Sequence, residues 1–131
     1  IIAAPSDQSS DAEWGCNGTL LSGADGIAIG TGNQNTIDIM AGCSTPGIAA
    51  RLCGDLTLNG YSDWYLPSKD ELNKLFLNRT AIGGFVADEY VWYWSSTQEA
   101  NNGAWMQNFA NDLQGYTYKY VEAPVRAIRS F

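Results

Sequence analysis

The clearest structural signal in the chain is the stretch Gly60-Tyr-Ser-Asp-Trp-Tyr-Leu-Pro-Ser-Lys-Asp-Glu-Leu72. Its second half predicts a helix that begins after Ser68, because the side chains of Ser68 and Glu71 can each accept the other residue's backbone N–H in a capping box. Apolar side chains then recur at helical spacing, at Leu72, Leu75 and Phe76. The first half predicts a turn and a short extended aromatic segment that leads into the helix.

The two sides of this stretch differ in their predicted secondary structure. On the N-terminal side we expect short strands at 19–21 and 27–30 and helices at 36–41 and 46–55. On the C-terminal side we expect strands at 90–94, 104–109, 116–121 and 125–129, with a hairpin turn at 101–103. Helices followed by antiparallel strands predict an α+β domain. The polar residues 1–13 predict a tether, which leaves 14–131 as one domain.

The composition indicates a folded, acidic domain. Of the 131 residues, 45% are hydrophobic and 12% are aromatic, which argues against disorder. The net charge of −7 disfavours nucleic acid as a partner. No apolar run approaches the ~20 residues that a membrane-spanning helix needs, so we expect no membrane insertion.

Catalytic and metal-binding residue patterns are missing from the sequence. The chain has no histidine, which removes the commonest general base and the commonest metal ligand. The three cysteines, Cys16, Cys43 and Cys53, match no zinc spacing. No nucleophile can be paired with a base. We therefore expect a protein that is not an enzyme, with no metal site and no cofactor.

Four segments, taken in order, resemble those of a known family. They are the stretch 60–72, Tyr93-Trp-Ser-Ser-Thr97, Ala104-Trp105 and Val125-Arg-Ala-Ile-Arg129. Together they resemble the C-terminal domain family of the Legionella collagen-like protein, a surface adhesin, from about Trp14 to the end of the chain. The resemblance implies a C-type-lectin-like fold, a secreted protein at the bacterial cell surface, and ligand binding rather than catalysis. It also implies a homotrimer, because a collagen stalk has three chains.

The resemblance also bears on the cysteines. An odd count in a secreted domain predicts one disulfide and one free thiol. Relatives often carry a cysteine at the position of Cys53 and a matching one in the final strand, where this chain has Ala127. The resemblance therefore implies a disulfide between Cys16 and Cys43, with Cys53 buried as a small apolar residue. The calcium motifs of sugar-binding C-type lectins, Glu-Pro-Asn or Gln-Pro-Asp, do not occur.

The charges are distributed unevenly along the chain. Residues 1–60 carry six acids and one base, whereas residues 61–131 carry eight acids and six bases. Arginine and lysine bind sulfate esters and carboxylates, so a local basic surface predicts binding of sulfated glycosaminoglycans or other acidic polysaccharides. The candidate polyanion-binding residues are Lys69, Lys74, Arg79, Lys119 and Arg126. The alternative interpretation of scattered lysines is an ordinary solvated surface.

A second candidate surface lies on the predicted C-terminal strands. Tyrosine and asparagine at alternate positions resemble the adaptable contact surfaces of paratopes. The candidate residues of this alternative ligand surface are Asn101, Asn102, Asn108, Tyr116 and Tyr118. The predicted function is that of a trimeric adhesin domain that binds glycosaminoglycans for host attachment and biofilm formation. Two alternative functions remain. One is a diversified, C-type-lectin-like protein-binding module, and the other is a structural trimer cap for a stalk.

Overall fold

The computed structural model describes residues 1–130 as four short helices and seven strands. The helices are α1 (Gly32–Gly42), α2 (Ala49–Gly54), α3 (Lys69–Leu77) and α4 (Arg79–Ile82). The strands are β1 (Ile2–Ala3), β2 (Ser9–Ala12), β3 (Trp92–Ala100), β4 (Gly103–Asn108), β5 (Gln114–Tyr118), β6 (Ala123–Val125) and β7 (Ile128–Arg129). The predicted α+β class is confirmed. The C-type-lectin-like assignment stays a prediction.

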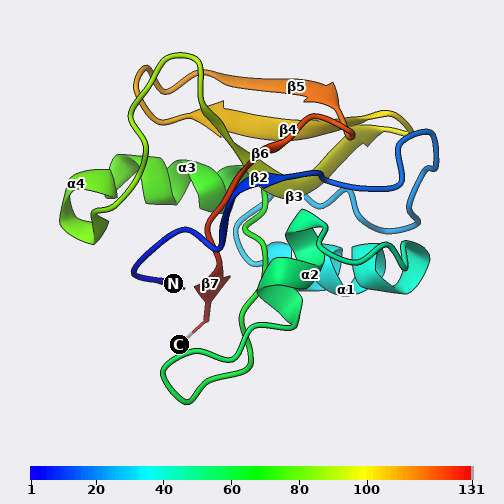
Figure 1. Cartoon of the computed structure of the whole chain (residues 1–131), viewed down its shortest axis with the longest axis horizontal. Helices are drawn as coiled ribbons and strands as arrows, with labels where there is room; N and C mark the ends of the chain where they lie inside the picture. Colours follow the sequence, from blue (N-terminus) through cyan, green and yellow to red (C-terminus); the bar gives the residue numbers. More distant parts are fainter. Residues whose placement is uncertain (131) are drawn as a thin grey trace.

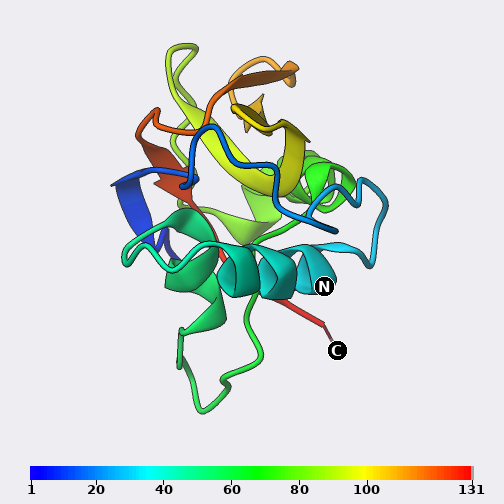
Figure 2. The ribbon, with the colours of Figure 1, turned by 90° about the vertical axis from the view of Figure 1, so that its right-hand side faces the viewer.

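The largest sheet is antiparallel and has the order β3-β4-β5. The predicted hairpin turn at 101–103 joins its first two strands. In Figure 1 this sheet lies at the top, with α3 and α4 beneath it on the left and α1 and α2 on the right. Figure 2 shows that α1 and α2 pack next to each other below the large sheet. Residues before and after the large sheet form two small sheets, β1 with β7 and β2 with β6.

The N-terminal segment is part of the folded domain, so the prediction of a tether over residues 1–13 is wrong. The strands β1 and β2 pair with the two C-terminal strands. Ala4 and Ala12 are buried, and the Ala12 carbonyl accepts the indole N–H of Trp94 at 2.9 Å. Polar composition misled the prediction, because small polar residues on these strands face water while a few small apolar ones face the core.

The predicted strands at 19–21 and 27–30 are also wrong. Side chains satisfy the backbone of this region in place of a neighbouring strand. Gln98 accepts the Leu21 N–H at 3.0 Å and donates to the Leu21 carbonyl. The Asn35 side chain binds the Gly26 backbone in the same way, accepting its N–H at 3.0 Å and donating to its carbonyl at 2.7 Å. Once the side chains make these bonds, the segment folds as turns.

The capping box predicted from Ser68 and Glu71 is present. Glu71 does more than cap its own helix. Its carboxylate, 1% exposed, accepts the N–H groups of Ser68 and Gly32 at 3.0 Å each and of Gly30 at 3.2 Å. The Tyr65 hydroxyl also donates to it at 3.3 Å. One carboxylate therefore satisfies the starts of α3 and α1 together, because unpaired N–H groups and partial positive charge gather at both helix ends.

The core has two parts. The larger one contains Trp14, Trp64 and Trp94, which confirms the predicted burial of Trp64 and Trp94. The smaller one packs the stripe of Leu72, Leu75 and Phe76 against the sheet and the C-terminal strand, as predicted. The indole N–H of Trp14 donates to the Ser95 carbonyl at 2.8 Å, so this large buried ring leaves no polar atom unpaired.

The predicted cysteine pairing is confirmed. Cys16 and Cys43 form a disulfide across a sequence separation of 27, and Cys53 is a free, buried thiol on α2. The disulfide joins the loop after β2 to the residue that ends α1. It therefore links the N-terminal strands to the helical side of the domain.

Candidate functional site

Three of the predicted polyanion-binding side chains lie on α3 and α4. Lys74 is exposed, and Lys69 and Arg79 are partly exposed. The backbone of Lys69 is fixed from both sides: its N–H donates to the Thr97 hydroxyl at 2.9 Å, and its carbonyl accepts the Gln114 amide at 3.1 Å. We call Lys69, Lys74 and Arg79 the basic helix surface.

Two of these bases rest on aromatic rings. The Lys69 ammonium lies 3.7 Å from the centre of the Trp105 ring, and the Arg79 guanidinium lies 4.0 Å from the centre of the Phe76 ring. Arg79 also donates to the Phe76 carbonyl at 2.9 Å. A cation over a ring face is held electrostatically and keeps its other donors available. The positions of both bases are therefore partly fixed before any ligand arrives.

Lys119 does not belong to this surface, and its prediction as an accessible base is wrong. It is fully buried, and its ammonium donates to the Thr19 carbonyl at 2.9 Å and to Gln98 at 3.1 Å. Its charge lies 4.6 Å from the centre of the Trp14 ring, inside the domain. Because burial penalises the charged form, the pKa of Lys119 falls to about 8. Lys119 holds loops together and does not face a ligand.

Arg126 is likewise buried, and its prediction as a ligand-binding base is wrong. Its Nε pairs with Asp7 at 2.8 Å, with none of its own side chain exposed. Its other donors bind the carbonyls of Ala4, Gly83 and Gly84 at 2.8 to 3.2 Å. Arg126 therefore joins the N-terminal segment to the loop after α4. No local motif indicates this role, and the tether prediction excluded Asp7 from the fold.

The second candidate surface is present in part. Asn101, Asn102, Tyr116 and Tyr118 are exposed, as that prediction requires. Asn108 is not: it is fully buried, and its amide donates to the carbonyls of Asp88 and Glu89 at 3.2 and 2.8 Å. Its inclusion was wrong because it lies at the end of β4, where it organises the loop before β3.

The sheet register shows which residues share the face that bears the exposed tyrosines. Trp105 pairs with Tyr116, and Gly103 pairs with Tyr118. Directly opposed residues in an antiparallel pair point to the same side, so these residues form one face. We call Trp105, Tyr116 and Tyr118 the aromatic sheet face. Trp105 was absent from the predicted surface, although the alternation of β4 against β5 could have placed it there.

A pocket of about 300 Å³ opens beside the aromatic sheet face. Its lining residues are Glu99, Asn102, Gly103, Tyr116, Thr117 and Tyr118. Asn102 and the tyrosines belong to the predicted surface, whereas Glu99, Gly103 and Thr117 do not. No local motif marks Glu99 and Gly103, because they approach the tyrosines only through the pairing of three strands.

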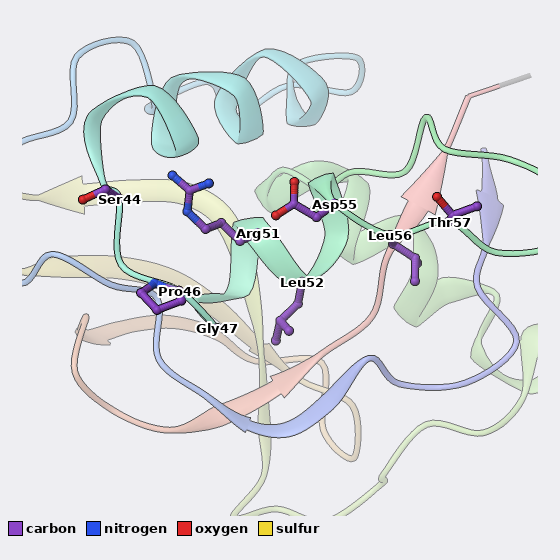
Figure 3. Close-up of a pocket in the computed structure, with 8 residues that line it drawn as sticks. All are labelled: Ser44, Pro46, Gly47, Arg51, Leu52, Asp55, Leu56 and Thr57. Carbon is purple, nitrogen blue, oxygen red and sulfur yellow. The ribbon is translucent and has the colours of Figure 1, made fainter.

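A cavity of about 550 Å³ lies beside α2 and is drawn in Figure 3. Arg51 is its only base, but its guanidinium turns toward α1, where it donates to the carbonyls of Met40 and Cys43 at 2.8 Å each. Arg51 thus satisfies the C-terminal end of α1. Leu52 and Leu56 point the other way (Figure 3), and the bonds of the Arg51 guanidinium to α1 direct it away from a ligand in this cavity.

The described residues 1–130 hold no group of three or more acidic or cysteine side chains placed to bind a metal ion. Within the same residues, none of the helices has the length and apolar character of a membrane span. These two findings concern the described part of the domain alone.

The fold and surfaces define a small, disulfide-linked α+β domain with a basic helix surface and an aromatic sheet face. Comparison with protein families gives a match to the Lcl C-terminal domain over residues 6–129. The chain therefore belongs to the Lcl C-terminal domain family, the C-terminal domains of Lcl-type collagen-like proteins. These are adhesin-type domains of surface-associated proteins and not a known enzyme family. A search of curated proteins returned no match.

Proposed function

We propose that this chain is the ligand-binding C-terminal domain of a secreted collagen-like adhesin, which binds sulfated glycosaminoglycans as a trimer at the bacterial surface. The observation that carries the proposal is the basic helix surface. Its three bases lie on the consecutive helices α3 and α4, in a chain whose net charge is −7. Local arrangement, and not the total charge, sets the field that a polyanion meets.

One copy of the domain offers little binding energy. Each exposed contact between a base and a sulfate is worth roughly 0–1 kcal/mol, and salt screens it. With Lys119 and Arg126 buried, three bases remain on this surface. Three copies on a collagen stalk would present nine bases to one polysaccharide chain. Avidity from such linked copies multiplies weak single contacts without any new interaction.

The test measures heparin binding across a salt series by surface plasmon resonance. The wild-type domain is compared with Lys69→Ala/Lys74→Ala/Arg79→Ala, and oligomeric state is followed by light scattering. We expect affinity to fall with salt, to fall at least about tenfold in the triple variant, and to be higher for the trimer than for the monomer. Equal binding by monomer and trimer would contradict the role of the trimer.

A matched control separates the basic helix surface from net charge. Asn17→Asp/Thr57→Glu/Asn59→Asp makes the chain three charges more negative, as the alanine variant does, at exposed positions away from α3. If only overall charge matters, both variants should lose the same affinity. If the basic helix surface binds the polyanion, the control should keep most of the wild-type affinity.

The aromatic sheet face supports a second candidate function, a protein-binding module. Tyr116 and Tyr118 are 59% and 51% exposed, and large exposed tyrosines are typical of adaptable protein-binding surfaces. Unchanged heparin binding in the alanine variant would shift the assignment to this face. If substitutions on the basic helix surface and on the aromatic sheet face both leave binding unchanged, the result would favour a structural trimer cap.

A further inference from the structure

In the pocket beside the aromatic sheet face, the Glu99 carboxylate lies close to Gly103. An ideal Cβ built on Gly103 would lie 2.9 Å from the Glu99 Oε2 and 3.6 Å from the Thr117 carbonyl oxygen. The carboxylate of Glu99 therefore occupies the space that a side chain at position 103 would take. Gly103 is not among the residues with positive φ, so its backbone does not require glycine. The missing side chain instead leaves room for Glu99 and for the pocket.

The walls of the pocket are two tyrosine rings supported by neighbours. Tyr118 stacks on Tyr120, with ring centres 5.2 Å apart and planes 7° from parallel. Tyr116 meets the edge of Trp105 at 5.1 Å. These contacts limit the positions of the rings while leaving more than half of each tyrosine exposed. A site with preset walls costs less ordering when a ligand binds.

The charge of the pocket is negative and uncompensated. Glu99 is the only ionisable acid or base in the lining besides the two phenols. Within residues 1–130 the ion pairs are Arg126 with Asp7 and Arg129 with Asp63, so Glu99 is not paired with a base there. A carboxylate beside two electron-rich rings attracts a cation and repels a sulfate or carboxylate.

From these observations we infer that the pocket of Glu99, Tyr116 and Tyr118 binds an organic cation, an ammonium or guanidinium group. The same sheet face already holds one such group, since the Lys69 ammonium lies 3.7 Å from the centre of the Trp105 ring. The cation enters between the tyrosine rings, with the Glu99 carboxylate as its counter-ion and the Asn102 side chain at the rim. The net charge of −7 adds long-range attraction for such ligands. Lys69 of the basic helix surface lies on this face, but none of Lys69, Lys74 and Arg79 lines the pocket, so failure of heparin binding would leave the cation site standing.

The test titrates the ¹⁵N-labelled domain with choline and with 3,3-dimethyl-1-butanol, which has the same shape and no charge. We expect choline to shift the amide signals of Gly103, Tyr116 and Tyr118 with a dissociation constant in the millimolar range, and the neutral alcohol to bind at least about tenfold more weakly. A lysine amide and an arginine amide, titrated in the same way, identify whether a free quaternary amine or a basic protein side chain fits better.

Variants make the assignment specific. Glu99→Gln keeps the shape of the pocket and removes its charge, so choline affinity should fall at least about fivefold. Glu13→Gln removes an equal charge at an exposed position outside the pocket and should change nothing. Tyr118→Leu should weaken binding while leaving the folded spectrum intact. Equal binding of the neutral alcohol, an unaffected Glu99→Gln variant, or no shifts with any cation at tens of millimolar would overturn the inference.

Discussion

Replacing Glu71 with glutamine should destabilise the domain far more than its small chemical change suggests. In the native structure one carboxylate oxygen accepts the N–H groups of Gly32 and Ser68, and the other accepts the Gly30 N–H and the Tyr65 hydroxyl. A glutamine side chain of the same shape keeps one acceptor oxygen. Its NH₂ group must then face the donors on the other side, and the Gly30 N–H loses its partner.

The magnitude follows from these bonds. Hydrogen bonds to a charged group are worth about 1.5–3 kcal/mol against about 0.5–1.5 for neutral ones, so the two bonds that survive weaken by about 1 kcal/mol each. The orphaned donor costs up to about 1–3 kcal/mol more, at the low end because Gly30 lies near solvent. The Tyr65 hydroxyl can turn to Ser130, 3.0 Å away. The total is about 2–4 kcal/mol, or a fall in Tm of about 10 °C for a domain of this length.

The assay is urea unfolding followed by tryptophan fluorescence, with Asp70→Asn as the matched control. Asp70 precedes Glu71 on the first turn of α3 but is exposed. Its neutralisation removes the same charge from the same helix end and should cost only about 0.3–1 kcal/mol. If Glu71→Gln destabilises the domain no more than Asp70→Asn does, Glu71 is not the shared cap of two helices and the reasoning is refuted.

Two further predictions address the N-terminus and the buried titratable groups. Deleting residues 1–8 removes β1 and leaves the buried Arg126 without its partner Asp7. The free energy of unfolding in urea should therefore fall by more than about 3 kcal/mol. If residues 1–8 were only a tether, the deletion would change nothing. Burial lowers the pKa of Lys119 to about 8 and raises the pKa of the Cys53 thiol. Between about pH 8 and 9, below the range in which unfolded tyrosines ionise, the unfolded chain retains the lysine proton that the folded chain releases. This difference raises the free energy of unfolding with pH, while ionisation of the unfolded Cys53 thiol lowers it. Stability should therefore rise with pH in Cys53→Ala and fall in Lys119→Met, each by at most about 1.4 kcal/mol per pH unit, and parallel profiles in the two variants would contradict this.

Local sequence signals predicted the local features of this fold. The capping box needs two side chains three residues apart, and the apolar stripe of α3 needs only helical spacing, so both were readable from the stretch 60–72. The hairpin at 101–103 follows from its turn residues in the same way. The Cys16–Cys43 pairing was inferred from the resemblance to relatives and not from spacing.

Features that depend on distant residues were missed. Lys119 and Arg126 look like surface bases in the sequence, because long charged side chains are usually exposed. Their burial depends on partners about a hundred residues away, Thr19 for one and Asp7 for the other. Glu71 was identified as a cap of one helix, yet its contact with Gly32 at the start of α1 could not be read from spacing. The pocket at Glu99 was missed for the same reason.

The segments that carry the family resemblance hold the fold together, and most of the candidate binding residues lie outside them, with Lys69 and Trp105 as exceptions. Asp63 binds Arg129 through two hydrogen bonds, at 2.7 and 3.1 Å, which lowers the pKa of Asp63. The Ser96 N–H donates to the Pro67 carbonyl at 2.7 Å, so two of the segments join directly.

The exposed residues proposed to bind ligands lie mostly between these structural contacts. The side chains of Lys74, Glu99 and Tyr118 are exposed and lie outside the four segments, so we expect them to tolerate change without loss of the framework. Members of the family that share the four segments can therefore differ in ligand.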